Sequence, residues 1–180
     1  MKIKKIELPA KSILFDRKNT FDYTDSFEGE MKSAPQNIDI SEVGRIFFSS
    51  SPKWGKKMFA FRNKMVKLFG LKTGDNGKQT KNMNDFTCEI GEQVGIFKIF
   101  DKTDHEIIIG EDDKHLDFRV SLLYDPTKDK NKENCLTIST TVKFHNWLGV
   151  LYFLPVRPFH QLIVPAILKR MITQLNTTVA

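Results

Sequence analysis

The chain has 180 residues, of which 40% are hydrophobic and 28% are charged. These values are typical of a folded protein and exclude an intrinsically disordered chain, and the length fits one domain. We therefore expect a single domain over residues 1–180, with its core at about residues 20–175. The two cysteines, Cys88 and Cys135, lack the short Cys or His spacing of a zinc site, so we expect reduced thiols, with a disulfide as the alternative.

The net charge of +6 comes from one segment of the chain. Residues 53–72 contain no acid and seven basic residues: Lys53, Lys56, Lys57, Arg62, Lys64, Lys67 and Lys72. These seven charges exceed the net charge, so the rest of the chain is slightly acidic and the basic isoelectric point is a local feature. The N-terminus lacks the apolar run of a secretory signal, which predicts a cytoplasmic protein.

The first half of the chain predicts one strand followed by two short helices. Residues 20–31 alternate apolar and polar side chains, as in a half-exposed strand. Asp39 or Ser41 can cap a first helix that carries Val43, Ile46 and Phe47. Residues 52–69 place aromatic and Met side chains at helical spacing, which predicts a second helix, and residues 71–84 have the composition of a loop.

From residue 94 onward the apolar period changes to two, which predicts an antiparallel meander. The expected strands are residues 94–101, 105–111, 115–124 and 135–145. In the third strand Leu116 and Phe118 point to one face, while Asp117 and Arg119 point to the other. Which of the two faces is concave is not decided by this pattern.

The last element is a strongly apolar helix at about residues 148–175. We expect Pro155 and Pro158 to separate its first turns from the main helix, and Pro165 to kink it, because proline removes an internal hydrogen bond. Arg157, His160 and Gln161 interrupt the apolar run, which argues against a membrane span. These polar side chains lie close together on the helix, so we expect a shared polar spot or an anchor to the sheet.

The order of these elements is that of an α+β helix-grip fold, in which a curved antiparallel sheet wraps a long C-terminal helix. Three stretches make the chain resemble the bacterial family called domain of unknown function 2867: Phe69-Gly-Leu-Lys-Thr-Gly74, Gly110-Glu-Asp-Asp-Lys-His-Leu-Asp-Phe-Arg-Val-Ser121, and Phe144-His-Asn-Trp-Leu-Gly149 continuing to Arg157-Pro-Phe-His160. The resemblance implies a START-like (SRPBCC-like) fold with no agreed activity and no established catalytic residues. It also implies association with an oxidoreductase domain in some members, a domain that is absent from this sequence.

Two groups of polar residues are candidate sites. His115, Asp117 and Arg119 follow an acidic turn and could transfer a proton or hold an anion, although a solvent-exposed ion pair explains them equally well. The second candidate ligand-binding group comprises His145, Trp147, Arg157 and His160. The carboxylates at 111–113 are consecutive and point in different directions, so we predict no metal site. Standard catalytic and cofactor motifs are absent, so we predict no cofactor.

We expect first a binding module for a small apolar or amphipathic molecule, held between the sheet and the C-terminal helix. The second hypothesis is a small-molecule enzyme that uses His115, Asp117 and Arg119. The third is a protein that binds an anionic surface through the basic helix at residues 53–69, although a helix with buried aromatic residues and solvated lysines is the more common case. We expect neither nucleic acid nor a membrane span as a partner.

Overall fold

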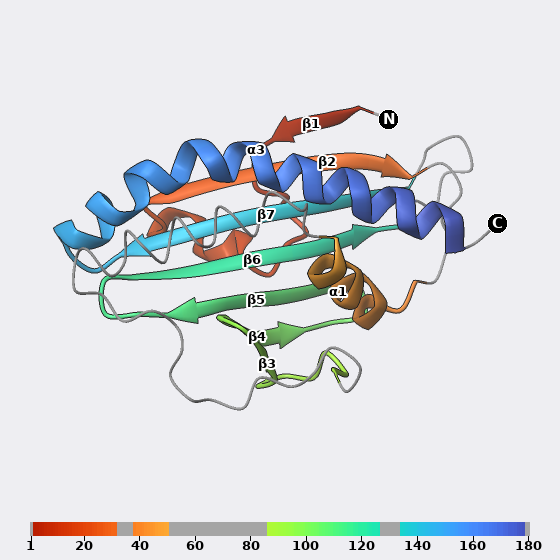
Figure 1. Ribbon diagram of the computed structural model, residues 1–180, viewed down its shortest axis with the longest axis horizontal. Helices are drawn as coiled ribbons and strands as arrows, with labels where there is room; N and C mark the ends of the chain where they lie inside the picture. The colour runs from red at the N-terminus through yellow and green to blue at the C-terminus, as the bar shows by residue number, and fades with distance from the viewer. Residues whose placement is uncertain (1, 32–37, 51–85, 127–133, 179–180) are drawn as a thin grey trace.

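The computed structural model describes residues 2–31, 38–50, 86–126 and 134–178. These residues form an α+β fold with one curved, seven-stranded sheet, a short helix and a long C-terminal helix (Figure 1). In chain order the elements are β1 (Ile3–Ile6), the 3-10 helix η1 (Phe15–Thr20), β2 (Tyr23–Met31), α1 (Ile40–Ser49), β3 (Gln93–Val94), β4 (Phe97–Lys102), β5 (Glu106–Asp112), β6 (Leu116–Asp125), β7 (Asn134–Phe144) and α3 (Trp147–Thr178). The predicted fold class is confirmed, and the arrangement is consistent with a helix grip.

The sheet order is β1-β2-β7-β6-β5-β4-β3, and every neighbouring pair is antiparallel. The predicted antiparallel meander is therefore confirmed, except that a turn at Gly95, which has a positive φ, divides the strand expected at 94–101 into β3 and β4. β7 pairs with β2 on one side and with β6 on the other. The register places Asp25 of β2 opposite Thr140 of β7. The strand β1 was not predicted, because its four residues carry two lysines and form an edge that pairs only with β2.

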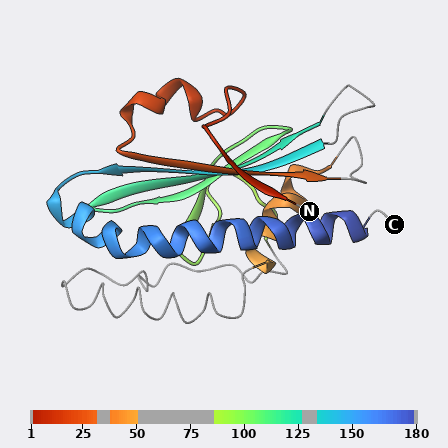
Figure 2. The ribbon, with the colours of Figure 1, turned by 90° about the horizontal axis from the view of Figure 1, so that it is seen from above.

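The two faces of the sheet are covered by different parts of the chain. In Figure 2 α3 lies on one side of the sheet and η1 lies on the other. We call the α3 side the inner face and the η1 side the outer face. Leu116 and Val120 of β6 are buried at the inner face, whereas Leu8 and Leu14 of the N-terminal segment pack with Ile108 at the outer face. The side of the sheet that α3 covers is therefore the one that carries the apolar residues of β6.

Asp39, one of the two predicted N-caps, caps the helix α1, and its side chain accepts a hydrogen bond from the Ser41 amide. Its apolar side buries Val43 and Phe47 against the inner face. The predicted helix at residues 52–69, the loop at 71–84 and the stretch at 69–74 lie outside the described residues.

The helix α3 continues for 32 residues through Pro155, Pro158 and Pro165. The prediction that Pro155 and Pro158 separate the first turns was wrong. Each proline removes one backbone hydrogen bond, and the packing of α3 along β2 and β7 outweighs that loss. The C-terminal half of the helix is part of the core, where Leu168, Met171 and Ile172 are fully buried.

By length and composition, Trp147–Thr177 could also cross a membrane, and 17% of its most apolar window is buried. Several large apolar side chains on its first half are exposed, among them Trp147, Leu154 and Leu162. The prediction that the chain has no membrane span therefore stays a prediction.

Two glycines of the stretches that carry the family resemblance sit where no Cβ fits. A Cβ on Gly149, in the first turn of α3, would clash with the carbonyl oxygen of His115. A Cβ on Gly110 of β5 would clash with the carbonyl oxygen of Phe118 on β6. Both glycines therefore allow close backbone packing, and Gly149 sets where α3 begins relative to the sheet.

Candidate functional site

A pocket of about 230 Å³ lies between the inner face of the sheet, α1 and α3. We call it the helix pocket. Its lining is mostly apolar and includes Phe47 of α1, Phe97 of β4, Phe118 of β6 and Val156 of α3. Glu111, near the end of β5, and Asp113, in the turn to β6, are also among its lining residues. This is the place at which the sequence predicted a ligand-binding cavity.

Aromatic rings form one wall of the helix pocket. Phe97 makes edge-to-face contacts with Phe47, Phe48 and Phe118, with ring centroids 6.0, 5.8 and 5.7 Å apart. Such contacts hold the rings in defined orientations. The wall is therefore a largely preformed apolar surface, suited to a flat or aliphatic molecule.

At β2, β7 and α3 the pocket adjoins a polar pole, which we define as Tyr23, Asp25, Thr140 and His160. His160 lines the pocket, and its Nε2 lies 3.2 Å from Oδ1 of Asp25. The hydroxyl of Tyr23 donates to the other oxygen of Asp25, at 2.5 Å. The side chain of Asp25 is 1% exposed, so this carboxyl group is satisfied by protein groups and not by bulk water.

The remaining polar groups of α3 gather around Tyr23. Gln161 donates from Nε2 to the Tyr23 hydroxyl at 3.3 Å, and the Arg157 guanidinium lies 5.3 Å from the centre of the Tyr23 ring. Burial, reinforced by the hydrogen bond to Asp25, raises the pKa of Tyr23 to about 12. Arg157, His160 and Gln161 thus form the shared polar spot predicted from their spacing, and they also anchor α3 to β2.

Thr140 contributes a hydroxyl without a partner. Its Oγ1 is buried and makes no hydrogen bond to the part of the chain that the structure describes, although the residue lines the helix pocket. Because Thr140 lies opposite Asp25 in the β2–β7 register, the two side chains are neighbours on the inner face. A buried hydroxyl without a partner is costly, so a bound molecule that hydrogen-bonds Thr140 would gain affinity from that contact.

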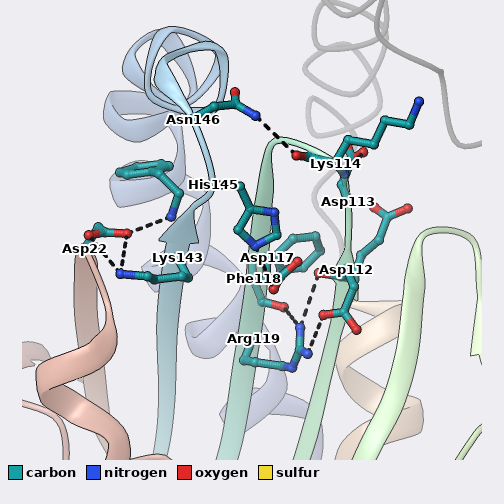
Figure 3. Close-up of polar contacts among 12 residues, drawn as sticks. Asp22, Asp112, Asp113, Lys114, Asp117, Phe118, Arg119, Lys143, His145 and Asn146 are labelled. Atoms are coloured by element: carbon teal, nitrogen blue, oxygen red, sulfur yellow. Dashed lines mark hydrogen bonds and ion pairs between the residues drawn. The ribbon is translucent and has the colours of Figure 1, made fainter.

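Asp117, Arg119 and His145 lie on the outer face, away from the helix pocket. His145 approaches Oδ2 of Asp117 with its Nε2 at 3.0 Å, and Arg119 pairs with Asp112 (Figure 3). Arg119 also stacks on Phe100, with its guanidinium carbon 3.5 Å from the ring centre. Asp117 and Arg119 line a second, more polar pocket of about 380 Å³. Among the described residues, Oδ1 of Asp117 and the hydroxyl of Thr141 in this pocket have no hydrogen-bond partner.

His115 and Trp147 are near this region but do not line either pocket. Nδ1 of His115 lies 3.1 Å from Oδ1 of Asn146, and Asn146 in turn donates to the Lys114 carbonyl at the β5–β6 end of the sheet (Figure 3). Trp147 is 70% exposed. The structure therefore places His115, Asp117 and Arg119 around the end of the sheet and not together in the helix pocket.

Sequence reasoning did not select Asp25 and Tyr23 as site residues. Both lie in the predicted first strand and carry inward-facing polar atoms, but an Asp in an alternating strand normally faces water. The sequence does carry one signal for a buried Asp25. Tyr23, Asp25 and Phe27 are spaced two apart, so Asp25 shares its strand face with two aromatic side chains.

Neither cysteine is a reactive group in this structure. Both are free thiols, and burial raises the pKa of Cys88 and of Cys135 to about 11. Across residues 2–31, 38–50, 86–126 and 134–178, no cluster of three or more His, Cys, Asp or Glu side chains could hold a metal ion.

The fold and pocket define an α+β protein with a small, aromatic-walled cavity between a sheet and its C-terminal helix. The family model described as protein of unknown function (DUF2867) matches residues 17–167, so the chain belongs to that family. No curated protein matches the chain. No solved structure matches it either, so the predicted START-like relationship stays a prediction.

Proposed function

We propose that this protein binds a small, largely apolar molecule with one hydrogen-bonding group in the helix pocket. The observation that carries this function is a mostly apolar cavity that adjoins the polar pole, with Glu111 and Asp113 as its other charged lining residues. An apolar body would contact the aromatic wall, and its polar group would reach Thr140 and His160. Most small-molecule sites combine an apolar lining with a few placed polar groups in this way.

The size of the pocket limits the ligand. An engineered apolar cavity of roughly 150 Å³ accepts benzene, and the helix pocket is larger, at about 230 Å³. We therefore expect a molecule of one or two rings, or an aliphatic chain of similar volume. The unpaired Thr140 hydroxyl favours a ligand that carries a hydroxyl or carbonyl group over a pure hydrocarbon.

Calorimetric titration with 2-naphthol and with its methyl ether tests this function. Both probes offer the same aromatic body, but only the first can donate a hydrogen bond. We expect saturable binding of 2-naphthol to the full chain, and weaker binding of the ether. Replacing Thr140 by Val should reduce the difference between the two probes, because the variant keeps the shape of the side chain and loses the hydroxyl.

A matched pair of substitutions on α3 locates the binding site. Val156 lines the helix pocket, so Val156→Trp should fill it and weaken 2-naphthol binding at least tenfold. Val150 lies on the same helix with its side chain exposed, so Val150→Trp should leave the affinity unchanged. Equal affinity of the two variants, or no saturable binding to the unaltered protein, would refute the proposed function.

A further inference from the structure

The polar pole contains a histidine whose orientation is held by a buried acid. The ring of His160 touches Asp25 through Nε2, and the hydroxyl of Tyr23 holds the second carboxylate oxygen. Because a carboxylate only accepts hydrogen bonds, a neutral His160 in this contact carries its proton on Nε2 and its lone pair on Nδ1. His160 makes no other side-chain hydrogen bond to the described parts of the chain.

This pairing differs from the histidine pairing at the outer face. The side chain of Asp25 is 1% exposed and that of His160 is 16% exposed, whereas the side chains of Asp117 and His145 are both about one third exposed. Water can therefore replace the contact between Asp117 and His145 at little cost. The contact between Asp25 and His160 is shielded from water, so it holds the imidazole ring in a defined orientation.

The surroundings of His160 suit proton transfer to a bound molecule. Charged and titratable groups near it come from β2 (Asp25 and Tyr23) and from α3 (Arg157), and Glu111 and Asp113 line the same pocket. The other residues of α3 that line the pocket are aliphatic or aromatic. An apolar cavity contains little water. Few water molecules therefore compete with a base at its edge for the proton of a bound substrate.

We propose that the helix pocket is an active site in which His160 acts as general base on a small apolar substrate with a weakly acidic C–H or O–H group. This rests on the ligand binding proposed above. Nδ1 takes the proton, the bond to hydrogen breaks, and its electron pair stays on the substrate. Asp25 is a positioning residue, and the hydroxyl of Thr140 can donate to the oxygen on which negative charge develops.

The probe for this step is 5-nitrobenzisoxazole, a bicyclic apolar carbon acid. Loss of its C–H proton to a base breaks the ring N–O bond, and the electron pair ends on the oxygen of 2-cyano-4-nitrophenolate, a yellow product. No oxidant or co-reactant is needed. We expect the full chain to convert the probe with saturation, and 2-naphthol to inhibit the reaction competitively.

Substitutions assign the base. A positioned general base contributes a factor of roughly 100 to 10,000, so His160→Gln should lower kcat at least about 100-fold. His105, an exposed histidine at the β4–β5 turn, provides the matched control, and His105→Gln should leave the rate unchanged. Asp25→Asn should lower kcat about tenfold or more with little change in KM, because it disturbs the tautomer and not the apolar wall.

Chemical rescue separates catalysis from a merely structural role. His160→Ala opens space beside Asp25, and added imidazole should restore part of the lost rate. Retained 2-naphthol binding by each variant shows that its pocket is intact. An unaltered protein that binds 2-naphthol but converts the probe no faster than imidazole in buffer would overturn the base while leaving the binding function standing. If His160→Gln keeps both the rate and the saturation of the unaltered protein, the assignment of His160 as general base is also overturned. If the unaltered protein neither binds 2-naphthol nor converts the probe, both functions are refuted.

Discussion

Glu106, at the start of β5, holds the N-terminal segment on the outer face of the sheet. It is 2% exposed, and its carboxylate accepts three hydrogen bonds: from Ser12 Oγ at 2.6 Å, from Ser121 Oγ at 2.5 Å and from the Ile13 amide at 2.7 Å. All three donors point at one acceptor-only group. Replacing Glu106 by Ala would leave these donors unpaired in a buried place.

The magnitude follows from the number of donors lost. Each buried polar group left without a partner costs about 1–3 kcal/mol. The Ser12 oxygen keeps its contact as acceptor from the Leu14 amide, but its O–H group loses its acceptor, as do the Ser121 hydroxyl and the Ile13 amide. We therefore expect Glu106→Ala to lower the free energy of unfolding by about 4 kcal/mol. Glu106→Gln keeps the shape but turns one acceptor into a donor, and about 2 kcal/mol is expected.

Urea unfolding of the full chain measures both values, and hydrogen exchange reports the Ile13 amide directly. Glu89 is the control, because its side chain is 63% exposed and pairs with Lys102 at 2.7 Å on the surface. Glu89→Ala should change the stability by less than about 1 kcal/mol. If Glu106→Ala costs no more than Glu89→Ala, the buried carboxylate does not hold the N-terminal segment.

Two further predictions concern Gly149 and Tyr23. Gly149→Ala should lower the free energy of unfolding by about 2 kcal/mol in urea, because its Cβ meets the His115 carbonyl; Val150→Ala, one residue on and exposed, should have little effect, and equal losses would contradict the clash. Burial raises the pKa of Tyr23 to about 12 from 10.0, so the folded chain holds the phenolic proton more tightly than the unfolded chain, and stability falls as the pH rises through this window. Tyr23→Phe should weaken that fall, and an unchanged pH dependence would refute the assignment to Tyr23.

Much of the sheet was predictable from short-range pattern. The strand expected at residues 115–124 is β6, Leu116–Asp125, and the one expected at 135–145 is β7, Asn134–Phe144. Alternation of apolar and polar side chains identifies such strands because successive residues point to opposite faces. The continuity of α3 through three prolines was not predictable, since it depends on packing against β2 and β7.

The candidate site was predictable only on the α3 side. The spacing of Arg157, His160 and Gln161 indicated a polar spot, but the partner of His160 is Asp25, 135 residues earlier in the chain. No local pattern connects two residues at that separation. Their contact depends on where α3 crosses β2, and therefore on the close packing at Gly149 and on the β2–β7 register.

By itself the sequence determined which side chains share a face of each strand and that the last helix is apolar, because both follow from the geometry of the backbone repeat. It separated Leu116 and Phe118 from Asp117 and Arg119 correctly. Only the tertiary structure decided which of those faces α3 covers. Since α3 packs on the apolar face and the N-terminal segment covers the other, Asp117 and Arg119 are outside the helix pocket, and His160 meets Asp25 inside the fold.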